Sequence, residues 1–242
     1  MVWSSELVTR RSLLTSLVIL SVLLLSGLAT GYILLRHEPE AYAQAAVPPG
    51  PDREVKSEEF DRKIMTLVND IQCEADWQAE FTEAQINSYL AEDFLRSKPF
   101  QLPRHISDPR VKFRPGQVII GFRYGDGELS SVVSLCAKVW LPRAEPNLLA
   151  LEIQQLRAGA MPLAIKLLQD ELDEMARKQN LDIQWYRHEG NPVAIIRYQA
   201  DKREPTVVLK ELEVRAGVLL VKGRTLEPAM PEPVKGEKTA GR

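Results

Sequence analysis

The segment "LEIQQLRAGAMPLAIKLLQDEL", Leu151 to Leu172, changes its periodicity halfway. Its first part alternates apolar and polar residues, which predicts a β-strand, whereas its second part repeats apolar residues every three or four positions, which predicts a helix. Gly159 and Pro162 lie between the two parts, where glycine permits a sharp bend and proline suits the first turn of a helix. We therefore expect a strand that turns directly into a short amphipathic helix, from about Pro162 to Lys178.

The N-terminal region carries the strongest signal in the chain. The segment Leu13–Leu35 is 23 residues long and has no charged side chain. At about 1.5 Å per residue, a helix of this length crosses the roughly 30 Å hydrocarbon core of a bilayer. Arg10 and Arg11 precede the segment, which favours a cytoplasmic N-terminus. The sequence thus predicts a single-pass protein of the cell membrane whose main domain lies outside the cytoplasm.

Two other interpretations of this region stay open. "AYA", Ala41–Ala43, has the small-x-small form of a signal-peptidase site, so that the domain is alternatively exported after cleavage near Ala43. "TRRSLL", Thr9–Leu14, resembles a twin-arginine export signal. The apolar run is longer than the usual h-region of about 7–15 residues, which favours an uncleaved anchor.

Composition shifts divide the chain into four parts. We expect a cytoplasmic tip with the membrane anchor (1–35), a linker rich in proline, alanine and charge (36–56), a folded domain (57–227) and a disordered tail (228–242). Ser57 is expected to cap a first helix, and Thr82 and Gln85 match a capping box at the start of a second.

The remainder of the domain is predicted to be mostly strands. Alternating apolar segments follow one another through short turns at Pro115-Gly116, Glu189-Gly190-Asn191 and Arg215-Ala216-Gly217. Such closely spaced strands favour antiparallel neighbours over a parallel sheet. The expected fold is therefore α+β, with a curved antiparallel meander sheet packed around or against one or two helices.

A sheet curled around an apolar helix has two possible interiors, a packed core or a groove for an apolar guest. Both use the same leucine and isoleucine side chains, and a packed core is the commoner outcome for any one of them. The residues that would line a lipid groove come from the quoted helix and from the strands before it: Leu163, Leu167, Leu168, Val139, Leu141, Leu151 and Ile153.

Several classes of function lack support in the sequence. The net charge of −2 gives no general attraction to nucleic acid. The chain contains no Gly-x-Ser-x-Gly elbow, no phosphate-binding P-loop and no Cys or His spacing that suits a metal. Cys73 and Cys136 are expected either to form a disulfide, as the oxidising exterior permits, or to stay as two separate buried thiols. We thus expect a protein that is not an enzyme and uses no cofactor.

The order of these segments resembles the YpmS-like membrane-anchored family and, more distantly, the LmeA-like phospholipid-binding proteins and tubular lipid-binding domains. The resemblance covers roughly Phe81 to Gly223. It rests on the motifs "FTEAQINSYL", "GQVIIGFRYG", "LRAGAMPLAIKLL" and "LEVRAGVLLVKG". It implies an extracytoplasmic domain that binds lipid in a groove, and it transfers no site residue.

Two functions follow as hypotheses. The first is a membrane-anchored module of the cell envelope that binds or handles a phospholipid or another acyl ligand in an apolar groove. The second is a scaffold or assembly protein that binds another envelope protein through its sheet edge or its tail. An enzyme ranks third, because the sequence shows no convergent set of polar groups.

Overall fold

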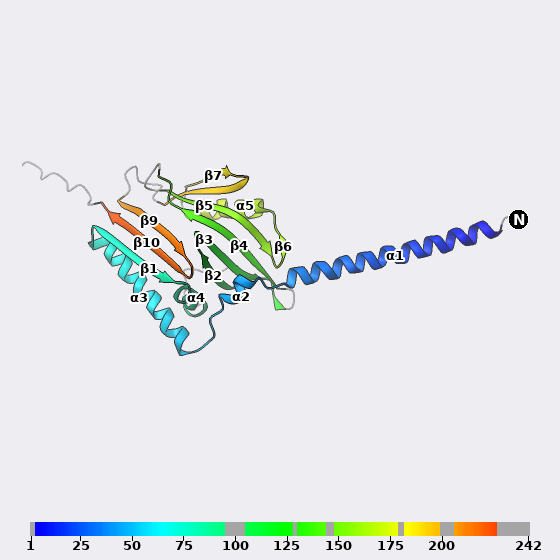
Figure 1. Cartoon of the computed structure of the whole chain (residues 1–242), viewed down its shortest axis with the longest axis horizontal. Helices are drawn as coiled ribbons and strands as arrows, with labels where there is room; N and C mark the ends of the chain where they lie inside the picture. Colours follow the sequence, from blue (N-terminus) through cyan, green and yellow to red (C-terminus); the bar gives the residue numbers. More distant parts are fainter. Residues whose placement is uncertain are drawn as a thin grey trace, which may run out of the picture.

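Figure 1 shows the computed structural model of the chain. The structure describes residues 3–94, 105–127, 130–143, 148–178, 182–198 and 206–226. It confirms the expected α+β class, since an apolar N-terminal helix is followed by a large antiparallel sheet and a few helices. A second, smaller sheet lies beside the large one, and the N-terminal helix projects away from both (Figure 1).

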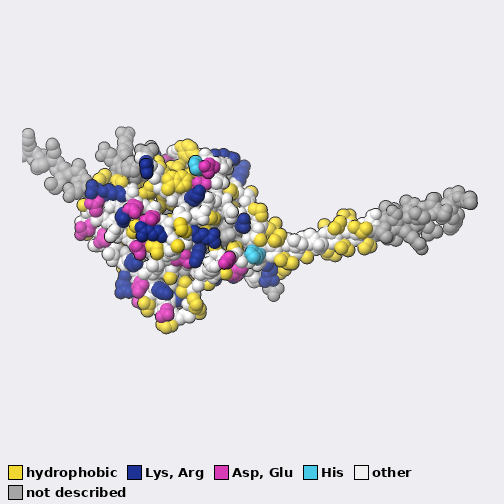
Figure 2. All heavy atoms as spheres, in the orientation of Figure 1, with side chains coloured by type: hydrophobic (Ala, Val, Ile, Leu, Met, Phe, Trp, Pro, Cys, Tyr) yellow, Lys and Arg dark blue, Asp and Glu magenta, His cyan; other side chains and the backbone are white. Residues whose placement is uncertain are grey.

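The N-terminal helix α1 (Trp3–Arg36) is 34 residues long. Of the helices in the described ranges, it is the one whose length and composition suit a membrane crossing. Its described apolar side chains are exposed, for example Leu25 at 65% and Ile33 at 67%. Figure 2 shows hydrophobic side chains along this helix, whereas basic and acidic side chains are intermixed over the domain.

The predicted linker, 36–56, differs from the expectation because it contains helical segments. Helix α2 (Glu40–Gln44) buries Tyr42, which is 3% exposed. Helix α3 (Pro51–Cys73) begins at Pro51, whose missing amide costs little in a first helical turn. Ser57, predicted as a helix cap, therefore lies inside α3, where its hydroxyl donates to Asp93 Oδ2 at 2.6 Å.

The large sheet has the strand order β2-β3-β4-β5-β8-β7, and all its pairs are antiparallel. The turns predicted at Pro115-Gly116 and Glu189-Gly190 connect β2 to β3 and β7 to β8. The simple meander ends after β5, because helix α5 and strand β7 intervene before β8 returns to pair with β5. Its strands are β2 (Ile106–Arg114), β3 (Gln117–Tyr124), β4 (Ser131–Trp140), β5 (Leu148–Ala158), β7 (Asp182–His188) and β8 (Asn191–Arg197).

The small sheet has the order β1-β10-β9. Its strands are β1 (Asp76–Thr82), β9 (Val207–Arg215) and β10 (Val218–Thr225), and the turn predicted at Ala216-Gly217 connects the last two. Strand β1 was not predicted. The ring of Trp77 lies so close to Gly223 that a Cβ atom at that glycine would be 2.2 Å away. Trp77 is thereby buried at 6% exposure, and it ties the first strand of the domain to the last.

Helix α4 (Glu83–Glu92) confirms the predicted capping box. Gln85 N–H donates to Thr82 Oγ1, and Thr82 N–H donates to Gln85 Oε1. The helix also covers the free edge of β2, where Asn87 hydrogen-bonds both backbone groups of Val111 and the Glu83 carboxylate accepts from Phe113 N–H. The backbone groups at this sheet edge are therefore satisfied by side chains rather than by another strand.

The two faces of the large sheet differ sharply in polarity. On one face, cross-strand rows are apolar, such as Val118–Ala137–Ile153 and Ile120–Leu135–Leu156. On the other face, the neighbouring rows are Arg110–Gly121–Ser134–Arg157 and Lys112–Ile119–Cys136–Gln155. A bulge opposite Cys136 and Ala137 keeps this division intact along β5. We call these the apolar face and the basic face.

The quoted segment turns more tightly than predicted. Gly159, with φ of 57°, reverses the chain so that β6 (Met161–Pro162) pairs back onto β5. Helix α5 (Ile165–Lys178) then begins at Ile165 rather than at Pro162. Trp185 Nε1 donates to Asp173 of this helix at 2.8 Å. Because Trp185 shares a cross-strand row with Ala194 and Leu151, α5 lies on the apolar face.

The possible disulfide is not formed. Cys73 is a free, exposed thiol at the end of α3, and Cys136 is a free, half-buried thiol on the basic face of β4. The alternative of two separate thiols is therefore the observed one, although Cys73 is not buried. The sequence alone gave no distance between the two residues.

Candidate functional site

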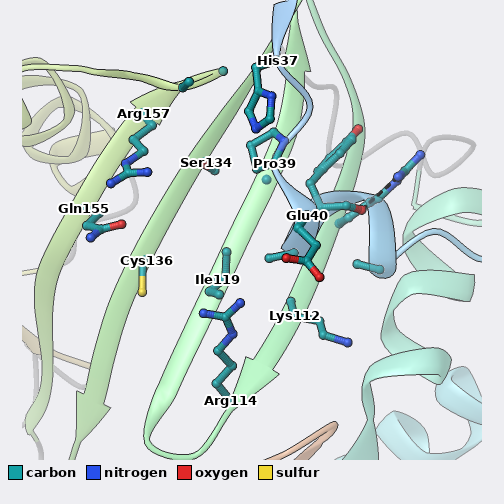
Figure 3. A pocket seen from close by; sticks show the side chains of 17 residues that line it. His37, Pro39, Glu40, Lys112, Arg114, Ile119, Ser134, Cys136, Gln155 and Arg157 are labelled. Carbon is teal, nitrogen blue, oxygen red and sulfur yellow. Dashed lines mark hydrogen bonds between the residues drawn. The ribbon is translucent and has the colours of Figure 1, made fainter. Parts of the chain in front are cut away.

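A cleft of about 270 Å³ lies over the basic face, next to the end of α1. Strands β2 to β5 form its floor, and the chain from His37 to Ala45 forms one wall. Figure 3 shows Arg114 and Ile119 on two floor strands, Arg157 and Gln155 together on another, and Glu40 reaching down from the wall. Candidate lipid-groove residues from the sequence do not line this cleft.

Tyr42 fixes the wall to the sheet. Its ring lies against Gly121, where a Cβ atom would be 2.6 Å from the ring. Its hydroxyl donates to the Asp108 carbonyl at 2.8 Å, and its own carbonyl accepts from Arg110 at 3.0 Å. The Arg110 guanidinium also lies over the ring, 4.2 Å from its centre. A single buried aromatic side chain thus attaches α2 to strands β2 and β3.

A bulge in β2 supplies part of this attachment. The register shifts between Ser107 and Arg110, and Asp108 has φ of 51°, a backbone region that aspartate tolerates better than most residues. The Asp108 carboxylate pairs with Arg110 at 2.7 Å, and Glu38 pairs with Arg123 at 2.7 Å. The first pair spans the bulge within β2, and the second joins the segment after α1 to β3.

The end of α1 is held by the sheet as well. Ala160 N–H donates to the Leu34 carbonyl at 2.8 Å, and the Ser131 hydroxyl donates to the Leu35 carbonyl at 2.6 Å. The last carbonyls of a helix have no partner within the helix, so these two contacts act as its cap. Gly159 makes the approach possible, since a Cβ atom there would lie 2.3 Å from Leu34 O.

The cationic side chains of the cleft fall into two groups. Arg110 and Lys112 are paired with Asp108 and Glu83, respectively. Arg114 and Arg157 are exposed and make no hydrogen bond or ion pair with any of the residues described. Glu40 is the single carboxylate among the described lining residues, and it accepts from Gln44 at 2.8 Å.

The cleft offers little for nucleophilic or metal chemistry. Burial raises the pKa of the Cys136 thiol, opposed in part by Arg114, and a thiol held protonated is a weak nucleophile. Within the described ranges, no group of three His, Cys, Asp or Glu side chains is placed to hold a metal ion. What the cleft presents is a set of hydrogen-bond donors, which suits an anion.

The residues predicted for a lipid groove lie mainly on the apolar face. Val139 and Leu151 are directly opposite each other and half-buried, and Leu141, Leu163 and Leu168 are half-buried too. Ile153 is 0% exposed and belongs to the packed interior. The Leu167 side chain lies outside the described part of the structure.

The most open part of the apolar face was not predicted. Helix α5 contacts β5, and β9 contacts β2 and β4. On this face Ile120 is 40% exposed, and its neighbours are half-buried. We call this set the open apolar strip: Ile120, Phe122, Val133 and Leu135.

Alternation within "QVIIGFRY" and "SVVSLCAKVW" places the strip residues on one face, yet it cannot say which neighbours leave them uncovered. The cleft had a clearer signal, because "RVKFR" repeats a basic residue at every second position, Arg110, Lys112 and Arg114. In a strand, such a repeat places all three charges on the same face.

Comparison with known proteins identifies no relative: no family model, no curated protein and no solved structure matches this chain.

Proposed function

We propose that this chain is a membrane-anchored lipid-binding protein. Helix α1 crosses the membrane with its N-terminus in the cytoplasm, and the domain binds an acyl chain of a phospholipid on its apolar face. The observation that carries this proposal is the open apolar strip, in which Ile120 is 40% exposed at the centre of an otherwise apolar surface. The resemblance in sequence order to anchored and phospholipid-binding families agrees with it.

The energetic basis is the removal of methylene groups from water. Each buried methylene contributes about 0.8 kcal/mol, so roughly ten buried methylenes correspond to the ~8.2 kcal/mol of a micromolar dissociation constant. The cost of association comes on top of this, so most of an acyl chain has to be buried rather than a few of its groups. A guest would also cover strip side chains that now contact water. The proposal requires no catalytic step and assigns none.

The position of the strip relative to α1 favours a ligand that comes from the membrane. Phe122 lies two positions from the end of β3, where Tyr124 pairs with Ser131. Ser131 in turn contacts the last turn of α1 through the Leu35 carbonyl. An acyl chain therefore reaches the strip from the same end of the sheet at which the membrane helix is attached.

Photo-crosslinking of the full chain in proteoliposomes tests this proposal. The probe is a phosphatidylcholine with a diazirine near the end of one acyl chain, and peptide mapping locates the adducts. We expect adducts on β3 or β4 as well as on α1, which contacts lipid in any case and serves as an internal reference. Adducts confined to α1 would refute lipid binding by the domain.

The matched variants are Ile120→Asn and Val68→Asn. Both residues are β-branched and similarly accessible, at 40% and 49%, but Val68 lies on α3, away from the strip. We expect Ile120→Asn to lower adduct yield on β3 and β4 several-fold while the yield on α1 stays constant. Val68→Asn should change neither yield, and equal losses in the two variants would count against a site on the strip.

A second candidate function is an envelope scaffold that binds a partner protein through a sheet edge. The edge at β2 is covered by α4, whereas β7 forms the opposite edge with Tyr186 56% exposed. An uncovered edge is able to accept another strand. A photoreactive residue at position 184 that gives no protein adduct in cells would argue against this function.

A further inference from the structure

We infer that the basic cleft binds a phosphate group, and, on the proposed lipid-binding function, that this group belongs to a phospholipid. The open apolar strip and the cleft lie on opposite faces of one sheet, so the two sites are distinct. The group that the cleft would bind is a phosphate, and it belongs either to a lipid headgroup or to a soluble phosphate compound. The experiment below separates these sources.

Unpaired arginines carry the inference. Arg114 and Arg157 face the same cleft, and neither has a partner among the described residues, whereas Arg110 and Arg123 beside the cleft are each paired with a carboxylate. Both guanidinium groups are exposed, Arg114 near the end of β2 and Arg157 on β5, and they leave two positive charges of the cleft without a carboxylate partner among the described residues. Guanidinium groups also match phosphate oxygens in a bidentate geometry.

Neutral donors complete the set. The register places Ser134 directly opposite Arg157 and Cys136 opposite Gln155, so a hydroxyl and an amide flank the Arg157 guanidinium. Figure 3 shows Arg157 and Gln155 together on one side of the cleft and Arg114 on the other. A phosphate beside β5 would accept from Arg157, Ser134 and Gln155, and Arg114 adds positive charge to the same cleft.

The location of the cleft favours a headgroup. His37 lines the cleft and follows directly after α1. The polar layer of a bilayer extends several ångströms beyond its roughly 30 Å hydrocarbon core, and this layer contains the lipid phosphates. With α1 in a membrane, the entrance of the cleft therefore lies at or near the depth of the phosphates.

Glu40 allows a test in which the affinity for an anion should increase rather than decrease. Its carboxylate lines the same cleft and opposes an anion there. Glu40→Gln retains the shape of the side chain and removes this repulsion. A phosphate site therefore predicts tighter binding for Glu40→Gln and weaker binding for Arg114→Gln/Arg157→Gln, and a merely structural role for these residues would not produce opposite effects.

The experiment is calorimetric titration of the full chain in maltoside micelles, which contain no phosphate. The three probes are inorganic phosphate, dioctanoyl phosphatidylglycerol and dioctanoylglycerol, which has the same chains without a phosphate. The variants are Glu40→Gln, the double variant Arg114→Gln/Arg157→Gln, and Arg187→Gln as the control. Arg187 is exposed on β7, outside the cleft, and makes no ion pair with a described residue.

We expect phosphatidylglycerol to bind at a site that dioctanoylglycerol does not occupy, and the double variant to lower the affinity of that site about tenfold. Glu40→Gln should raise that affinity, and Arg187→Gln should leave it unchanged. If inorganic phosphate binds as tightly as the lipid and responds to the same variants, the cleft is a phosphate site whose source is soluble.

Two results would overturn the inference: equal affinity of the double variant and the wild type for every phosphate probe, or an equal loss in Arg187→Gln. Dioctanoylglycerol reports on the acyl-chain site alone. If dioctanoylglycerol binds but no phosphate probe responds to the cleft variants, the proposed lipid-binding function stands and the phosphate site in the cleft is refuted. If inorganic phosphate binds in the cleft but neither lipid binds, the phosphate site stands and the proposed lipid-binding function is refuted.

Discussion

The backbone N–H of Ala160 donates a 2.8 Å hydrogen bond to the carbonyl oxygen of Leu34. This contact joins the end of the apolar helix to the turn after β5, the same turn at which the quoted segment changes from strand to helix. The bend at Gly159 is therefore explained by the helix end that approaches it, and not by α5 alone. The turn that leads from β5 into β6 also caps α1.

Replacing Gly159 by alanine should destabilise the attachment of α1. The new Cβ atom would lie 2.3 Å from Leu34 O, and the positive φ of 57° adds backbone strain. Gly190→Ala is the matched control, because Gly190 also has a positive φ, 87°, but open space around it. We expect Gly190→Ala to cost about 1–2 kcal/mol and Gly159→Ala about 1–3 kcal/mol more, measured by urea unfolding of the full chain in micelles. Equal costs would show that the contact with Leu34 is unimportant.

Replacing Tyr42 by alanine should destabilise the domain although this residue precedes the folded region predicted from sequence. Tyr42 is 3% exposed, and removing a buried aromatic side chain costs about 3–5 kcal/mol. Tyr186→Ala removes the same side chain from a site that is 56% exposed and should cost under about 0.5 kcal/mol. Tyr42→Phe, which loses only the bond to the Asp108 carbonyl, should cost about 1 kcal/mol. A small effect of Tyr42→Ala in the same unfolding assay would contradict the attachment.

The mature protein should retain its N-terminal segment. Cleavage after Ala43 would remove Tyr42 from its site against Gly121 and leave an apolar hollow on the sheet. We expect the intact mass of the protein extracted from membranes to include residues before Ala41. A mature N-terminus at Gln44 would show instead that the domain is exported by cleavage and folds without this side chain.

Stability in acid should depend on Asp76. Arg224 and Lys210, which hydrogen-bond this exposed carboxylate, lower its pKa to about 2, against about 3.9 in an unfolded chain. Because the pKa of Asp76 is lower in the folded state, its ionised carboxylate stabilises the domain at pH values above the unfolded-state pKa. This contribution disappears as the pH falls from about 4 to about 2. The difference in urea midpoint between wild type and Asp76→Asn should therefore be present at pH 6 and vanish near pH 2. Glu189→Gln is the control, because Glu189 is exposed in a turn and has no ion pair with a described residue. A difference for Asp76→Asn that persists at pH 2 would show that the contacts of Asp76 with Arg224 and Lys210 are not its cause.

Local signals predicted much of the architecture. The alternation of apolar residues placed the strands from β2 to β5, and Gly190 and Gly217 marked two hairpin turns. Thr82 and Gln85 predicted the start of α4 because a capping box is a contact between near neighbours in sequence. These features depend only on residues a few positions apart, so periodicity and turn chemistry suffice to find them.

Long-range contacts could not be predicted in the same way. Strand β1 is recognisable only through its pairing with β10, and Trp77 is buried only because Gly223 leaves room for its ring. The segment around Tyr42 has the composition of a linker, yet one aromatic side chain attaches it to the sheet. Pro162 is compatible both with the start of a helix, as predicted, and with the short strand β6 in which it lies.

The candidate sites were predicted unevenly. The candidate groove residues included the half-buried pair Val139 and Leu151 and also the fully buried Ile153, because apolar periodicity does not distinguish packed from open positions. The basic repeat that includes Arg114 was visible in the sequence. Its significance depends on Arg157, which only the strand register brings into the same cleft.

The capped end of α1 has a mechanical consequence. The Leu34 and Leu35 carbonyls accept hydrogen bonds from the turn after β5 and from β4. We therefore expect the helix and the sheet to rotate together as one rigid body, without a hinge between them. A helix that crosses a thinner bilayer tilts further to keep its apolar length covered. In the single-pass arrangement that we propose, that tilt would reorient the whole sheet, so the thickness of the surrounding membrane would set the angle at which the domain meets the lipid surface.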